Sequence, residues 1–200
     1  KVMVAGHSKG GNLAVYAASQ IRPELQDKIS AVYTYDAPGL QAHLTETTGY
    51  QDVIPKIHRF VPQGSVIGMM LEVPDTPIVV KSTALGGIAQ HSTFSWQTED
   101  NHFVQLEEIS SESLQIKNTL KEWVDSVPDE ELELYFDLFF GTILESGISS
   151  INELSSKNAI DHVRQLFSQA QTLEPEQVEI LKNLTQLLLD ARFQAWKNHF

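Results

Sequence analysis

The sequence contains no cysteine among its 200 residues. This absence excludes a disulfide framework, a thiolate metal site and a cysteine nucleophile. It also fits the reducing conditions of the cytoplasm, where we expect the protein to act. Basic residues are scarce too, since 14 Lys and Arg stand against 26 Asp and Glu and the formal net charge is −12. A nucleic-acid partner is therefore not expected, because phosphate binding requires clustered Lys and Arg.

Long apolar runs are a second absence. No stretch approaches the roughly 20 apolar residues that a membrane-spanning helix requires, and we find no signal-peptide pattern, so no transmembrane segment is expected. Hydrophobic residues make up 42% of the chain and charged residues 20%, which is typical of a globular protein. A chain of 200 residues suffices for one domain with a real core, or for one core with an appendage.

The most informative segment that is present covers residues 6–10, which read Gly-His-Ser-Lys-Gly. An apolar run at 2–5 predicts a buried strand before it, and apolar residues at helical spacing over 11–22 predict a helix after it. A G-x-S-x-G turn in this context strains the serine backbone and exposes its hydroxyl. We expect both glycines to be needed because neighbouring chain passes close by. Ser8 is therefore the candidate nucleophile of a serine hydrolase; the alternative is a glycine-rich turn with an idle serine.

The oxyanion of such an enzyme needs backbone donors. We expect one from the N–H of Lys9, the residue after the nucleophile, at the positive end of the helix. The second normally comes from a loop that precedes the nucleophile strand. Since a sheet of this type usually has several strands before the nucleophile, we expect the chain to be the C-terminal part of a longer protein, with the second donor upstream of Lys1.

The rest of the chain divides into a strand-rich part and a helical part. Further strands are predicted at 29–35, 56–61, 77–82 (near a sheet edge, because it begins with proline) and 102–106, and a loop at 85–88. Helices are predicted at 111–127, 129–145, 158–171 and 175–199. We predict an α/β fold whose mostly parallel sheet starts at the nucleophile strand, followed by a helical C-terminal extension. The expected domains are 1–127, part of a hydrolase core, and 128–200, the extension.

A serine hydroxyl needs a base within hydrogen-bond reach, itself oriented by a carboxylate. In α/β-hydrolase folds these residues follow in the order Ser, acid, His. Among the seven histidines, His91 lies in a glycine-containing loop after the last clear strand, where such a base is normally carried. It is the candidate base, and His102 is the reserve candidate.

The acid is harder to choose. Residues 62–65, after the strand at 56–61, contain no carboxylate, but Asp36 ends the strand at 29–35 on the edge where loops should converge with Ser8. Asp36 is the candidate acid, Asp75 is the alternative, and Asp36 as a plain turn residue remains open. No H-x-x-x-H pattern or carboxylate cluster has metal-ligand spacing, so we expect neither a metal nor a cofactor.

Four segments resemble the lipase-like α/β hydrolases, and more narrowly the DUF2974 or Mbeg1-like family of uncharacterised bacterial hydrolases. They are residues 6–14, 35–39, 64–68 and 90–92 with Trp96. The similarity runs from residue 1 to about residue 150. It implies an α/β-hydrolase fold and a carboxyl-ester or related acyl substrate. The chain departs from ordinary class 3 lipases because no aspartate follows the strand at 56–61.

Two functions follow. The first is a serine carboxyl-ester hydrolase that acts on a small-molecule or lipid-like ester through an acyl-enzyme on Ser8. The alternative is an inactive hydrolase scaffold that binds a partner through its aromatic-rich helical extension, which carries Phe136, Phe139, Phe140 and Trp196 and could instead act as a lid. The sequence does not decide the acyl chain, and it leaves the oligomeric state open.

Overall fold

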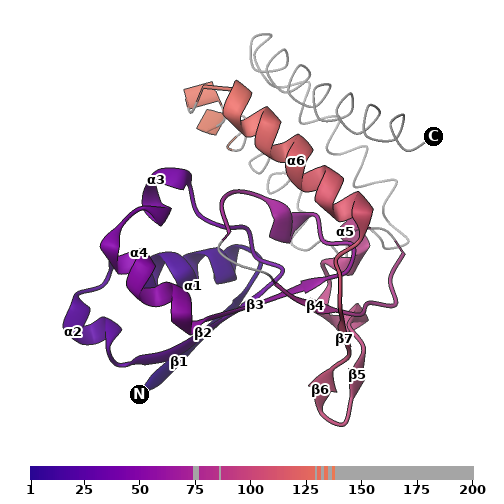
Figure 1. Cartoon of the computed structure of the whole chain (residues 1–200), viewed down its shortest axis with the longest axis horizontal. Coiled ribbons are helices and arrows are strands. Elements are labelled where there is room, and N and C mark those ends of the chain that lie inside the picture. The colour runs from indigo at the N-terminus through magenta and orange to yellow at the C-terminus, as the bar shows by residue number, and fades with distance from the viewer. Residues whose placement is uncertain (74–76, 86, 129, 132, 135–136, 138–200) are drawn as a thin grey trace. The chain divides into compact units, whose positions relative to one another are not determined.

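The computed structural model describes residues 1–73, 77–85, 87–128, 130–131, 133–134 and 137 (Figure 1). The chain divides into two units, Lys1–Lys121 and Glu122–Phe200. The first contains Ser8, Asp36 and His91 and is described here by itself; the boundary predicted between 127 and 128 stays a prediction. Among the described residues, no helix combines the length and apolarity needed to cross a membrane.

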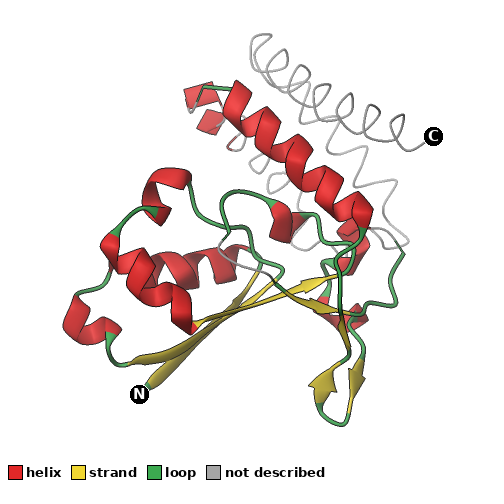
Figure 2. Cartoon of the chain, in the orientation of Figure 1, coloured by secondary structure: helices red, strands yellow, loops and turns green. Residues whose placement is uncertain are grey.

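The main sheet of the described chain has the strand order β1-β2-β3-β4-β7 (Figure 2). β1 to β4 run parallel, and β7 pairs with β4 in the antiparallel sense. Their bounds are β1 (Val2–His7), β2 (Ile29–Tyr35), β3 (Ile57–Pro62), β4 (Ile78–Val80) and β7 (Gln105–Leu106). Parallel neighbours require crossover connections, and helices supply them, so the fold is α/β.

Helices join these strands, and the longest crossover helix begins directly after Ser8. The helices are α1 (Lys9–Gln20), α2 (Pro23–Gln26), α3 (Ala42–Thr45), α4 (Thr48–Val53), α5 (Gly87–Gln90) and α6 (Ser111–Ser126). Short 3-10 turns are η1 (Ile54–Lys56), η2 (Ile67–Met69) and η3 (Thr93–Ser95). A separate two-stranded hairpin consists of β5 (Thr98–Glu99) and β6 (His102–Phe103).

One face of the sheet carries the core beneath α1 and α4, which lie side by side in Figure 1. Ala14 and Ala18 of α1 pack against Ile29 and Val32 of β2 and against Val53 of α4. Alanines at helical spacing give α1 a flat apolar stripe that lies close to the sheet. This packing fixes the direction in which α1 leaves the Ser8 turn.

Strand residues alternate between the two faces of the sheet. The face opposite α1 carries aromatic side chains. Tyr33 stacks on His58 with ring centroids 4.8 Å apart, and Tyr35 stacks on Phe60 at 5.5 Å. Phe103 of the β5–β6 hairpin contacts the rings of both Tyr35 and Phe60. The hairpin therefore covers this face at the end of the sheet where the candidate residues lie.

Most of the predicted elements within the described residues are confirmed. The strand at 29–35 and the helix at 111–127 match β2 and α6 closely, and β1 runs two residues beyond its predicted end. The predicted burial of this first strand is wrong for the described residues, because β1 is an edge strand of the sheet and Val2 and Met3 are exposed. The predicted loop at 85–88 is wrong at its end, because α5 begins at Gly87. The single strand at 102–106 is also wrong: β6 and β7 are two short strands that pair with different neighbours. The helices predicted at 158–171 and 175–199, and most of the one at 129–145, lie outside the described residues.

Candidate active site

Ser8 and Asp36 follow the ends of neighbouring parallel strands. His7, the last residue of β1, lies opposite Tyr35, the last residue of β2. The N–H of Ser8 donates to the Tyr35 carbonyl at 3.0 Å, and the N–H of Asp36 donates to the Phe60 carbonyl of β3 at 2.8 Å. The carboxyl edge of the sheet, where α/β folds place their ligand sites, therefore brings both residues together.

The Ser8 backbone is strained, with φ 55° and ψ −128°. A non-glycine residue in such a conformation costs about 1–3 kcal/mol and persists only where the surroundings impose it. The glycines allow the turn to close. A Cβ on Gly6 would lie 2.2 Å from the Gly10 carbonyl carbon, and one on Gly11 would lie 2.5 Å from the Ala37 Cβ.

The expectation that Gly10 is required by neighbouring chain is wrong for the part of the chain that the structure describes. A Cβ built there meets nothing within 4 Å. Gly10 is exposed, whereas Gly11, one residue further along α1, is buried and faces Ala37. The close approach that the motif implies is thus carried by Gly6 and Gly11.

The Ser8 side chain makes no hydrogen bond among the described residues, and it does not cap α1. Lys9 is the first residue of α1, so its N–H has no acceptor within the helix and lies at the positive end of the helix dipole. A free hydroxyl beside a free N–H is the arrangement that an attacking nucleophile and its oxyanion donor need.

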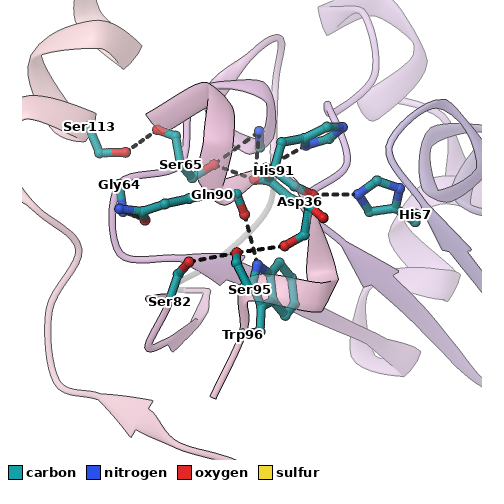
Figure 3. Close-up of polar contacts among 12 residues, drawn as sticks. His7, Asp36, Gly64, Ser65, Ser82, Gln90, His91, Ser95, Trp96 and Ser113 are labelled. Atoms are coloured by element: carbon teal, nitrogen blue, oxygen red, sulfur yellow. Dashed lines mark hydrogen bonds and ion pairs between the residues drawn. The ribbon is translucent and has the colours of Figure 1, made fainter. Parts of the chain in front are cut away.

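Asp36 and His91 meet although 55 residues separate them (Figure 3). The His91 Nδ1 and the Asp36 Oδ2 are 2.7 Å apart. Asp36 is fully buried and His91 is 3% exposed, so water does not compete for this hydrogen bond. An ionised carboxylate only accepts, so Nδ1 carries the hydrogen and Nε2 is left with its lone pair. This pairing favours His91 as the base and Asp36 as its acid.

The other oxygen of the Asp36 carboxylate is also occupied. Its Oδ1 accepts a hydrogen bond from the Ser65 hydroxyl at 2.5 Å and one from the Gly68 N–H at 3.1 Å. Asp36 itself has a positive φ of 43°, which turns the chain at the end of β2. Two donors on one oxygen and an imidazole on the other satisfy the buried carboxylate, as burial of a charge requires.

His7, the residue before Ser8, contacts both the backbone and the ring of His91. Its Nε2 donates to the His91 carbonyl at 2.8 Å, and the two imidazole rings lie 4.5 Å apart between centroids. Figure 3 shows the His7 ring directed toward the His91 loop. Because His7 precedes Ser8 in the chain, this contact places the His91 loop next to the Ser8 turn.

The loop that carries His91 is anchored by the residues around it. Gln90 accepts a hydrogen bond from the Gly64 N–H at 2.9 Å and donates to the Ala84 carbonyl at 3.1 Å. The Trp96 indole N–H donates to the Gln90 carbonyl at 2.8 Å. These contacts join the loop to the end of β3, so His91 is held on a fixed backbone.

Arg59 of β3 contacts Gly68, whose N–H binds Asp36. Its guanidinium donates to the Gly68 carbonyl, while its Nε has no hydrogen-bond partner. Burial lowers the pKa of Arg59 to about 10, although nearby Asp36 acts in the opposite direction. Arg59 therefore stays charged at neutral pH and provides a positive charge near the Asp36 carboxylate.

A small cavity adjoins Arg59, and its volume is about 20 Å³. It is lined by Val15, Thr34, Ala37, Pro38, Gly39, Leu40, Tyr50, Ile57, Arg59 and Val73. This volume suits about one water molecule, whereas pockets for organic ligands run to hundreds of Å³. The cavity is thus not where an acyl chain binds.

The remaining candidates lie elsewhere. His102 is exposed on the β5–β6 hairpin, and its Nδ1 bonds to the Asp100 carbonyl at 2.8 Å. Asp75, the alternative acid, lies outside the described residues. Within the described residues, no group of three or more His, Asp or Glu side chains is arranged to hold a metal ion.

Sequence reasoning missed the residues that surround Asp36. Ser65 follows the strand at 56–61 without being a carboxylate, so the search for an acid does not single it out, although the segment 64–68 carries part of the family resemblance. Ser113, whose hydroxyl donates to the Ser65 carbonyl, has no local signal because 48 residues separate the two.

Comparison with known families decides the chain's membership. A family model described as Mbeg1-like matches residues 1–141. The chain belongs to the Mbeg1-like family. The match to this Mbeg1-like model covers the whole site described above, from Ser8 to His91, and extends past Ser113. A search of curated proteins and a search of solved structures each found no match.

Proposed function

We propose that this Mbeg1-like protein is a serine carboxyl-ester hydrolase with an α/β-hydrolase-type core. Its substrate would be a small-molecule or lipid-like ester. The observation that carries the proposal is the buried hydrogen bond between Asp36 and His91 beside the positive-φ turn at Ser8. The order Ser8, Asp36, His91 along the chain and the family membership support it.

The acylation step would use these three side chains in sequence. Ser8 Oγ attacks the ester carbonyl carbon while His91 Nε2 takes the hydroxyl proton. Asp36 stays ionised, holds the imidazole in the Nδ1–H tautomer and stabilises the imidazolium that forms. The bond to the leaving alkoxide then breaks, and His91 returns the proton to that oxygen, so that an alcohol departs and Ser8 carries the acyl group.

The negative oxygen of the tetrahedral intermediate would be held by the Lys9 N–H. Because this group lies at the start of α1, both its hydrogen and the helix dipole favour the developing charge. Deacylation repeats the steps with water as the attacking group. His91 removes a proton from the water, and Ser8 recovers its hydrogen when the acid product leaves.

Among the described residues, no hydrogen bond joins Ser8 to His91, and catalytic hydrogen bonds of this kind often form only in the substrate complex. The contact of His7 with the His91 carbonyl supports the proposed proximity of the two groups.

Fluorophosphonate labelling of the full-length protein tests the proposal. We expect wild-type protein to be labelled and Ser8→Ala and His91→Ala to lose the label. His102→Ala is the matched control, since it removes an exposed histidine whose Nδ1 bonds to the Asp100 carbonyl, and it should be labelled like wild type.

Two results would contradict this function. Retention of the label by Ser8→Ala would remove the nucleophile, and loss of the label in His102→Ala but not in His91→Ala would move the base. No labelling of a folded wild-type protein would instead favour the inactive scaffold that binds a partner.

A further inference from the structure

We propose that Ser65 is a positioning residue for the acid of this site. Ser65 lies three residues after the end of β3, and its hydroxyl donates to Asp36 Oδ1 at 2.5 Å. Both residues are fully buried. The catalytic meaning of this contact rests on the function proposed above, whereas its effect on the orientation of His91 does not.

The contact fixes the plane of the carboxylate. Rotation about χ2 of an aspartate is broad, so a carboxylate without other partners can tilt away from the line of the imidazole N–H. Here the Ser65 hydroxyl and the Gly68 N–H both bind Oδ1, and only Oδ2 faces His91 Nδ1. Turning the carboxylate would break two hydrogen bonds to a buried charge. Ser65 therefore holds the acceptor in line with the His91 N–H.

Ser65 is itself immobilised on three sides. Its N–H donates to the Pro62 carbonyl at 3.0 Å, and its hydroxyl oxygen accepts from the Gly68 N–H at 3.1 Å. The Ser113 hydroxyl, at the start of α6, donates to the Ser65 carbonyl, and Ser113 is fully buried. Figure 3 shows Ser113 and Ser65 joined in this way above Asp36.

This arrangement is consistent with the absence of an aspartate directly after β3. Ser65 lies in that segment, and the carboxylate comes from the end of β2 instead. The end of β3 contributes the hydroxyl donor, so two neighbouring strands share the task of presenting one oriented carboxylate to His91.

The test measures the His91 Nδ1 proton by NMR in full-length protein labelled with nitrogen-15 at histidine. In wild type a proton held by a buried carboxylate gives a low-field resonance, identified by its loss in His91→Gln. We expect Ser65→Ala to shift or broaden this resonance and Ser65→Thr, which keeps the hydroxyl, to restore it. Ser19→Ala is the matched control, because Ser19 is a buried serine whose hydroxyl bonds to the Tyr16 carbonyl instead.

An unchanged His91 resonance in folded Ser65→Ala would overturn the proposal. If either Ser65 variant fails to fold, Ser113→Ala decides, since loosening the Ser65 backbone should shift the same resonance in the same direction by less. An unchanged resonance in that variant would overturn the proposal equally.

Esterase assays add a second criterion. We expect Ser65→Ala to lower kcat by about 10- to 100-fold with little change in KM, the range that one hydrogen bond to a charged group implies. In an Asp36→Asn background the same substitution should cause no further loss, because Ser65 acts through Asp36. If wild type shows no esterase activity, the proposed function fails, but the NMR result still decides the role of Ser65.

Discussion

The two halves of the site differ in how they are held. The nucleophile half is a strained turn: Ser8 has φ 55°, and its side chain makes no hydrogen bond within the described chain. In the acid–base half, buried side chains satisfy one another around Asp36 and His91. Under the proposed function, backbone strain exposes the serine that reacts, while hydrogen bonds restrain the two groups that must stay oriented.

Substitutions at Ser8 test whether this turn contributes to activity at the expense of stability. We expect Ser8→Ala to lower kcat/KM by roughly 10⁴- to 10⁶-fold, the range for loss of a serine nucleophile. Ser8→Gly should lose activity equally but unfold at a higher temperature than Ser8→Ala. Glycine adopts positive φ freely, and relieving the strain is worth about 1 kcal/mol. Esterase assays and thermal melts give both values; equal melting temperatures would show that the turn is not strained.

In the acid–base half, one substitution should reduce both properties. Asp36→Ala leaves the Ser65 hydroxyl, the Gly68 N–H and the His91 N–H without their shared buried acceptor. We expect a loss of about 3 kcal/mol in the free energy of unfolding, with activity reduced on the order of 10⁴-fold. Denaturant titration beside Ser8→Ala makes the contrast direct. A stability loss under about 0.5 kcal/mol would mean that these contacts do not hold the site.

A pair of glycine substitutions sharpens the comparison further. A Cβ on Gly68 would lie 2.6 Å from Asp36 Oδ1 and 2.7 Å from Ser65 Oγ, whereas one on Gly10 meets nothing within 4 Å. We expect Gly68→Ala to cost about 1–3 kcal/mol by overpacking. Gly10→Ala should be neutral or stabilising by up to about 1 kcal/mol, because alanine favours a helix. Thermal melts of the two variants test this, and equal effects would contradict it.

The smallest expected effect concerns pH and Tyr35, which lies between the two halves. Burial and the neighbouring Tyr33 raise the pKa of Tyr35 above 10.0. Since the folded state retains this proton longer than the unfolded state, the stability contributed is present below pH 10.0 and is lost as pH rises through the raised pKa. Tyr35→Phe should keep the packing and flatten this loss. As the pH is raised above 10.0, the melting temperature should therefore fall less steeply for the variant than for wild type.

The sequence predicted the frame of the site because its signals are local. The β-rich run at 29–35 and the turn residues after Asp36 mark where β2 ends, and the Gly-x-Ser-x-Gly pattern marks where β1 meets α1. The pairing of Asp36 with His91 followed from chain order and loop position. The surroundings of Asp36 were not predictable, because Ser65 and Ser113 act through contacts with residues 29 and 48 positions away.

The prediction that neighbouring chain requires Gly10 also fails for a physical reason. A pattern counts residue types, but crowding depends on the direction in which each Cβ would point. On α1 that direction turns by about 100° for each residue, so Gly11 faces Ala37 while Gly10 faces open space. The α1 direction, set by packing against β2 and α4, decides which glycine is indispensable.

The hydrogen bond from His7 to the His91 carbonyl also links two segments that lie far apart in the sequence. His91 and Ser8 are separated by a long stretch of strands, turns and loops, over which small displacements could accumulate. One hydrogen bond to the residue next to Ser8 bypasses that stretch. This contact therefore ties the His91 loop directly to the end of β1, whatever the length of the chain between the two.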